Sequence, residues 1–193
     1  MVKDYPDLRV VRTRQMIRDA FIDLLEHKSY DKITISELTK QANINRVTFY
    51  SHYTDLDDFL SQFVDELIDN IFECMKPLYN QPYKPGFELE TLTHLLEYIA
   101  DNEKIYHMMF VSKGIPYFTP RMIDFLRNLM LTHPRNENGY HFPGVEIETD
   151  IASWYGTSAL IGTISMWIGD GMPYPPRYLA EQIVKLNPFR INN

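Results

Sequence analysis

The sequence predicts an all-α protein, with a small N-terminal three-helix domain followed by a larger C-terminal helical bundle. Apolar residues recur at three- and four-residue steps along most of the 193 residues, which is the spacing of an amphipathic helix. No stretch of useful length alternates apolar and polar residues as a half-buried strand does. Helix-capping residues precede several of the apolar runs. About nine helices are therefore expected.

The first expected helix covers residues 8–28. Its core stripe consists of apolar residues at helical spacing, namely Ile17, Ala20, Phe21, Leu24 and Leu25. The residues Lys28-Ser29-Tyr30-Asp31 are expected to end it.

Two short helices joined by a tight turn are expected between residues 34 and 53. Thr34 and Glu37 have the spacing of a capping box, in which each side chain bonds the other residue's backbone N–H. Asn43 tolerates the left-handed backbone that a sharp turn between helices requires. Asn45 is a good N-cap for the second helix.

That second helix is too short to be stable alone, so Phe49 and Tyr53 are expected to pack it on its neighbours. A polar and basic face then points outward, which carries Arg46, Thr48, Tyr50 and His52. A short helix presented in this way fits the major groove of DNA, with its N-terminal residues at base edges and flanking hydroxyls on phosphates.

Residues 12–59 resemble the DNA-binding domain of the TetR/AcrR family of bacterial transcriptional regulators. The resemblance rests on the long first helix RTRQMIRDAFIDLLEHKSYDKITI, the turn ANIN and the run VTFYSHY. It implies a DNA-binding domain over residues 1–53 and a ligand-binding and dimerisation domain over residues 54–193. The expected DNA-binding residues are Thr34, Asn45, Arg46, Val47, Thr48, Tyr50 and His52. Arg46 and Val47 are expected at base edges, and the others on phosphates.

Three arginines at the start of the first helix have two interpretations that the sequence leaves open. Arg9, Arg12 and Arg14 lie where the family's chain runs near the minor groove or the DNA backbone. They are equally well explained as the solvated end of a helix.

A fourth helix is expected over residues 54–76, and it departs from the family pattern at its start. Leu56 occupies the position where family members commonly carry a lysine that meets a phosphate, and Asp55, Asp57 and Asp58 surround it. Acidic residues suit a helix N-terminus, but they would repel DNA if they faced its backbone. Thr39, where the family often has alanine, is a milder departure.

The remainder of the chain is expected to be helical after a proline- and glycine-containing break at residues 77–86. Expected helices cover residues 87–102, 104–111, 119–132, 147–168 and 178–186, with a polar loop at residues 133–144. The segments around residues 147–168 and 178–186 resemble the two-helix dimerisation element of the family, and MWIGDGMPYPPRYLAEQIVKL resembles a C-terminal domain common among such regulators in Firmicutes. A homodimer through these two helices would place two recognition helices on two half-sites.

Composition excludes several classes of protein. No apolar run approaches the ~20 residues of a membrane-spanning helix, and no signal peptide is recognisable, so a cytoplasmic protein without membrane contact is expected. The histidines and the single Cys74 form no HExxH or CxxC motif, so neither a metal nor a cofactor is expected. The absence of a nucleophile-elbow motif argues against an enzyme.

The charge distribution is compatible with a DNA partner although the net charge is −7. Residues 1–53 hold 9 Lys and Arg against 7 Asp and Glu, whereas residues 54–193 hold 10 against 19. A mildly basic head on an acidic body can dock to DNA end-on, although so small an asymmetry can also arise by chance.

The sequence therefore favours a regulator, in particular a repressor released from a palindromic DNA operator by an apolar small-molecule effector. Methionines and aromatic residues of the body could line a pocket for such a ligand. An alternative is a TetR-like co-regulator that acts through a protein partner, such as an activator of a dihydroxyacetone kinase operon. A helical enzyme with an unrecognised active site is a weaker third hypothesis.

Overall fold

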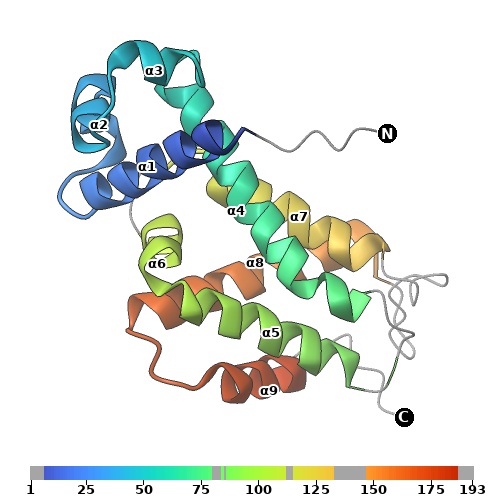
Figure 1. Ribbon diagram of the computed structural model, residues 1–193. Helices are drawn as coiled ribbons and strands as arrows, with labels where there is room; N and C mark the ends of the chain where they lie inside the picture. The colour runs from blue at the N-terminus through green and yellow to red at the C-terminus, as the bar shows by residue number, and fades with distance from the viewer. Residues whose placement is uncertain (1–6, 80–83, 85, 112–114, 133–146, 187–193) are drawn as a thin grey trace. The chain divides into compact units, whose positions relative to one another are not determined.

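Helices make up the regular secondary structure of the residues that the computed structural model describes, which are 7–79, 84, 86–111, 115–132 and 147–186 (Figure 1). These residues contain nine α-helices, one short 3₁₀ helix and no strand. The helices are α1 (Leu8–Leu25), α2 (Ile35–Gln41), α3 (Arg46–Tyr50), α4 (Leu56–Tyr79), α5 (Phe87–Asp101), α6 (Glu103–Val111), α7 (Phe118–Thr132), α8 (Thr149–Gly169) and α9 (Pro176–Leu186), with η1 (Tyr30–Lys32) after α1. The predicted all-α class is confirmed. The predicted polar loop at residues 133–144 lies outside the described residues.

The described chain divides into two compact units. Unit 1 contains the residues up to Glu66 together with Ile115, and unit 2 contains Leu67–Val111 and the described residues from Pro116 onward. Helix α4 contributes its first part to unit 1 and its second part to unit 2. The domain boundary expected after residue 53 is a functional division, and it stays a prediction.

Unit 1 is built around an aromatic cluster that joins α1, α3 and α4. The ring of Phe21 meets those of Phe59 and Phe63 edge-on at 5.0 and 5.5 Å, and the ring of Tyr53 meets that of Phe59 edge-on at 5.1 Å. Phe49 on α3 is fully buried against the same cluster. Full burial of one phenylalanine contributes roughly 1.5–3 kcal/mol, so the cluster holds the five-residue helix α3 that could not persist alone.

Two helix ends lie three residues from their predicted positions, whereas the other ends after residue 54 lie within two residues of theirs. Helix α1 ends at Leu25 rather than residue 28, because the backbone N–H groups of His27 and Lys28 both bond the Leu24 carbonyl in a tight turn. Helix α4 runs to Tyr79 rather than residue 76 and includes Pro77. A proline removes one backbone donor but keeps a helical φ, so a single one near the end of a helix of 24 residues does not stop it.

Unit 2 is a bundle in which α5 packs on α9, while α6 and α7 pack on α8 (Figure 1). Its interior is apolar and rich in methionine and aromatic residues. The buried members include Tyr106, Met108, Met109, Phe118 and Met122. Helix α8 ends at a glycine turn, where Gly171 has φ +73° and its N–H bonds the Ile168 carbonyl.

One face of α8 is not covered by the other described residues. No charged residue occurs from Ile151 to Gly169, and large apolar side chains along this helix are exposed. They are Ile151 (55% exposed), Trp154 (55%), Tyr155 (62%) and Met166 (70%). Ser158, Ala159 and Gly162 continue the same stripe at helical spacing and are also exposed. No helix among the described residues is long and apolar enough to cross a membrane.

Candidate nucleic-acid interface

The turn between α2 and α3 has the geometry that the sequence predicts. Asn43 has φ +53°, and its N–H bonds the carbonyl of Lys40 at 3.2 Å. The N–H of Ile44 bonds the carbonyl of Thr39 at 3.0 Å. These two bonds satisfy carbonyls at the end of α2 in the manner of a Schellman motif, so the chain leaves α2 sharply and can start α3 within three residues.

Helix α3 is fixed at its start by Asn45. The Oδ1 atom of Asn45 accepts a hydrogen bond from the backbone N–H of Thr48 at 2.7 Å and another from the Thr48 hydroxyl at 3.0 Å. An N-cap of this kind satisfies one of the four free N–H groups that begin a helix. The Asn45 and Thr48 side chains are therefore already ordered in the structure without DNA.

The outer face of α3 presents the residues that are expected to meet DNA. Arg46 is exposed and makes no hydrogen bond or ion pair with another described residue. Val47 is 77% exposed and Tyr50 is 48% exposed, whereas Phe49 between them is buried. A guanidinium suits the acceptor edge of guanine, a small apolar side chain suits the thymine methyl group, and a phenol hydroxyl can donate to a phosphate.

His52 follows α3 and lies next to Tyr53, whose ring centroid is 6.2 Å from its own. Burial lowers the pKa of His52, and the positive charge of Arg14 lowers it further. The Arg14 guanidinium lies over the Tyr53 ring, with its central carbon 5.7 Å from the ring centroid. The sequence pattern grouped Arg14 only with other arginines near the start of α1, and no spacing within α1 indicates its contact with a residue 39 positions later.

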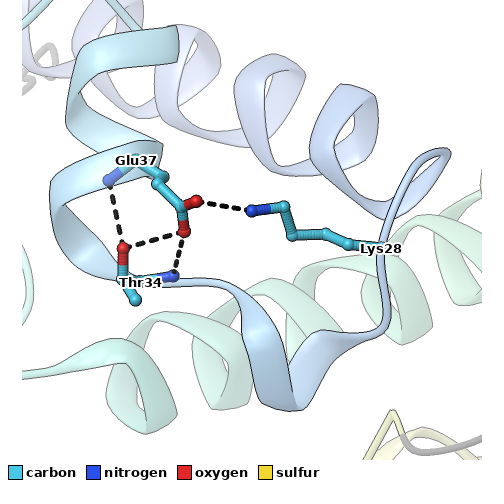
Figure 2. A network of polar contacts seen from close by, with 3 residues as sticks. All are labelled: Lys28, Thr34 and Glu37. Atoms are coloured by element: carbon cyan, nitrogen blue, oxygen red, sulfur yellow. Dashed lines mark hydrogen bonds and ion pairs between the residues drawn. The ribbon is translucent and has the colours of Figure 1, made fainter.

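Thr34 caps α2 through the predicted capping box (Figure 2). Its Oγ1 accepts from the Glu37 N–H at 3.3 Å, while its own N–H and hydroxyl bond the Glu37 carboxylate at 3.1 and 2.9 Å. The Lys28 ammonium bonds the other carboxylate oxygen at 2.6 Å. These partners, led by the Lys28 ammonium, lower the pKa of Glu37 to about 2. The capping box was predictable, but Lys28 was not, because nine residues separate it from Glu37 outside any single helix.

Local hydrogen bonds hold the acidic residues at the start of α4. Asp55 accepts from the N–H of Asp58 at 2.8 Å, Asp57 accepts from the Tyr30 hydroxyl at 2.6 Å, and Asp58 accepts from the N–H of Thr54 at 2.8 Å. These carboxylates cap the helix and tie η1 to it, which gives each of them a structural role. Leu56 in their midst is half-buried.

Unit 1 therefore brings all seven predicted residues onto α3 and the segments beside it. Six of them, Asn45, Arg46, Val47, Thr48, Tyr50 and His52, lie within eight consecutive residues, and Thr34 stands at the start of α2. Whether they contact DNA stays a prediction.

The described part of the chain shows no metal-binding site. It contains no group of three or more His, Cys, Asp or Glu side chains placed to hold a metal ion. Burial raises the pKa of the Cys74 thiol, which makes it a weaker nucleophile than a free cysteine.

Comparison with known proteins finds regulators of transcription. Residues 89–188, more than half of the 193-residue chain, match the family model TetR_C_8, described as a transcriptional regulator C-terminal region. The HTH-type transcriptional regulator YxbF of Bacillus subtilis (strain 168) is 29% identical over 184 residues, which cover 93% of this chain and 45% of that protein. This chain thus spans less than half the length of that relative.

A second relative and a solved structure agree with this result. The HTH-type dhaKLM operon transcriptional activator DhaS of Lactococcus lactis subsp. lactis (strain IL1403) is 25% identical over 135 residues, which cover 69% of this chain and 68% of that one. The crystal structure of a TetR transcriptional regulator from Streptococcus agalactiae 2603V superposes with a TM-score of 0.72 at 25% identity, covering 93% of this chain and 95% of that chain.

Proposed function

Because this chain belongs to the TetR family of transcriptional regulators, we propose that it binds a specific DNA operator through α3. The chain is a transcriptional regulator rather than an enzyme, as are the relatives that it matches. The observation that carries the proposal is the exposed face of α3, where Arg46, Val47 and Tyr50 point away from a helix that Asn45 caps and Phe49 anchors. The protein would work in the cytoplasm, where its operator is accessible.

The proposed contacts divide into base contacts and phosphate contacts. Arg46 and Val47 at the start of α3 would meet base edges in the major groove. Phosphates would meet Thr34, Asn45, Thr48, Tyr50 and His52. Both donors of Thr34 already bond Glu37, so a phosphate there would share or replace those bonds.

The assignment is tested by comparing Arg46→Ala with Tyr50→Ala on two labelled duplexes, one enriched from a random pool and one of mixed sequence. Losing Tyr50 should weaken binding to both duplexes by a similar factor, whereas losing Arg46 should also reduce the preference for the enriched one. Lys76→Ala is the matched control, because it removes an exposed positive charge outside unit 1. If Arg46→Ala left both affinity and preference unchanged, α3 would not be the recognition helix.

We also propose that the protein is a homodimer through α8 and α9. The uncharged outer face of α8 supports this, because an exposed apolar stripe along a whole helix is unusual for a monomer. Helix α9 adds Tyr178 (48% exposed) and Leu186 (81% exposed). A two-fold dimer would match a palindromic operator.

A charge placed in the middle of this stripe tests the dimer. Ala159→Glu alters an exposed position, so it should leave the fold of each chain intact and yield monomers in analytical ultracentrifugation. Thr119→Glu, at an exposed position of α7, adds the same charge elsewhere and should leave the dimer unchanged. A dimer that persists in Ala159→Glu would place the interface elsewhere.

For regulation, we propose a repressor that leaves its operator when an apolar small molecule binds in unit 2. The methionine and aromatic interior described above supports an adaptable apolar site. The hydroxyl of Thr91 on α5 is buried and has no partner among the described residues, so it offers one polar anchor. The ligand would act through α4, which contributes to both units, and it must bind the DNA-free state more tightly to shift the equilibrium.

A screen of apolar ligands for release of the labelled duplex tests this regulation. An active ligand should lose affinity for Thr91→Val, which removes the hydroxyl and keeps the side-chain shape. If the ligand released DNA from Thr91→Val and from the wild type with equal affinity, Thr91 would not be the anchor. If transcription in a reconstituted assay increased when the protein was added, the protein would not be a repressor.

A second candidate function is that of a co-regulator acting through a protein partner. The similarity to DhaS, whose name describes an activator of the dhaKLM operon, favours it. DNA binding by the purified protein, without any partner, distinguishes the two functions. Sequence-selective binding by the isolated dimer supports the operator-binding regulator, whereas a folded dimer that binds DNA only after a partner protein is added supports the co-regulator.

A further inference from the structure

Arg14 is a partly buried arginine of α1 that forms no ion pair with a described residue. Its side chain is half-buried, and its guanidinium lies over the Tyr53 ring. Its Nε atom is buried and has no hydrogen-bond partner among the described residues. Buried polar groups in native proteins almost always have a partner, so the described fold leaves one donor of this guanidinium unpaired.

The neighbouring Arg18 has a structural role, because it forms an ion pair within unit 1. One turn further along α1, its guanidinium bonds the Glu66 carboxylate at 2.6 and 2.7 Å. Arg14 makes no such ion pair with a described residue. Asp58 is close enough for the charge of Arg14 to contribute to lowering its pKa, yet it bonds Thr54 and Gln62 instead.

The position of Arg14 relates it to the recognition helix. The Arg14 guanidinium lies on Tyr53, which comes three residues after the end of α3. The charge of Arg14 also contributes to lowering the pKa of His52. Arg14 therefore places a cation that forms no ion pair with a described residue beside His52, which is already expected at a phosphate. Because the guanidinium is stacked and partly removed from water, an anion that meets it gains more than one that meets a fully solvated side chain.

We propose that Arg14 is itself a DNA-binding residue, which holds a backbone phosphate beside His52 at the end of α3. This inference rests on the proposed function. The stacked guanidinium is pre-organised, and its planar fork of donors matches a phosphate. Since every phosphate is alike, Arg14 contributes affinity without sequence preference.

The test measures the salt dependence of binding to the enriched and the mixed-sequence duplexes by fluorescence anisotropy. Arg14→Met keeps a flexible side chain on the Tyr53 ring but removes the charge, and Arg14→Lys keeps the charge but not the planar fork. Arg121→Gln is the matched control, because Arg121 lies over the Tyr117 ring at 5.4 Å in unit 2. That variant removes both a charge and a stacking contact away from α3.

Arg14→Met should weaken binding to both duplexes by roughly tenfold at low salt, as expected for losing a hydrogen bond to a charged group. The plot of log affinity against log salt should become less steep by about 0.9 for each Arg14 that leaves a phosphate. Arg14→Lys should keep the original slope, and Arg121→Gln should behave as the wild type. An unchanged affinity in Arg14→Met would overturn the inference. A weaker affinity with an unchanged salt slope would also overturn it, because that result means that Arg14 has a purely structural role.

A spectroscopic measurement on the wild type covers the case in which Arg14→Met does not fold. The Nε–H resonance of Arg14, identified by its absence in Arg14→Lys, should shift when the mixed-sequence duplex is added. A resonance that does not move while the protein is bound overturns the inference and leaves the proposed function standing. If the wild type binds neither duplex, the proposed function fails and the inference fails with it.

Discussion

Asn45 has two roles in this account, since it caps α3 and stands at the DNA surface, and two substitutions separate them. Asn45→Ala removes the side-chain oxygen that accepts from the N–H and hydroxyl of Thr48. Asn45→Asp keeps an acceptor at the same position and adds a negative charge. The first variant tests the cap, and the second tests the proximity of DNA.

The size of the stability effect follows from the cap. Replacing an N-cap asparagine by alanine costs about 1 kcal/mol. Helix α3 has five residues and one side-chain cap, so no neighbouring turn can replace the lost bond. Thr48 is only half-buried, so its released hydroxyl can turn to water, which keeps the cost near this value. Asn45→Asp should retain the stability of the wild type, because a carboxylate at a helix N-terminus is favourable.

Urea unfolding measures stability, and anisotropy with the enriched duplex measures binding. Asn45→Ala should lower the free energy of unfolding by about 1 kcal/mol and weaken binding modestly. Asn45→Asp should unfold like the wild type yet bind DNA far more weakly than Asn45→Ala, because its charge would face phosphates. A destabilised Asn45→Asp would refute the cap argument, and an Asn45→Asp that binds as well as the wild type would refute the placement of DNA.

Three further predictions concern stability. The partners of Glu37 hold its pKa at about 2 rather than 4.5, so its charge stabilises the fold above about pH 4.5 and this contribution disappears as the pH falls to 2. Glu37→Gln should therefore have a lower melting temperature than the wild type at neutral pH. A difference in melting temperature that survives at pH 2 would contradict this origin. Asn43 has φ +53°, so Asn43→Ala should lower the free energy of unfolding in urea by about 1 kcal/mol, whereas Asn43→Gly should not. Equal stabilities of Asn43→Ala and the wild type would mean that the turn relaxes. The Tyr106 hydroxyl donates to the Leu67 carbonyl at 3.3 Å, and burial raises the pKa of Tyr106 far above its usual value of 10. Tyr106 should therefore lose its stabilising contribution as the pH rises above 10, and Tyr106→Phe should show a weaker alkaline loss of stability than the wild type; parallel pH profiles would show that the phenol ionises within the fold.

Much of unit 1 was predictable because its signals are local. The capping box of Thr34 and Glu37, the left-handed turn at Asn43 and the cap at Asn45 each depend on residues at most three positions apart. Chemistry at such short range is decided by the sequence almost irrespective of the rest of the fold.

The interactions that sequence reasoning missed join residues that are distant along the chain. The stack of Arg14 on Tyr53 and the bond from Lys28 to Glu37 arise only after the helices have packed. Periodicity shows that α1 has a buried stripe, but it does not show which residue of another element a flanking arginine will meet. The extension of α4 past Pro77 differs from the prediction for another reason, because a proline indicates a break in the sequence although its φ suits a helix.

Selection from a pool of random DNA duplexes at low salt, by the purified protein and by Tyr50→Ala in parallel, measures whether α3 recognises a DNA sequence. If α3 reads an operator, the wild type should enrich a palindrome whose half-sites are about one helical turn apart, and the variant should lose that enrichment. Failure to enrich any sequence, by a protein that is folded and dimeric in solution, would contradict the assignment of α3 as a recognition helix and favour the co-regulator.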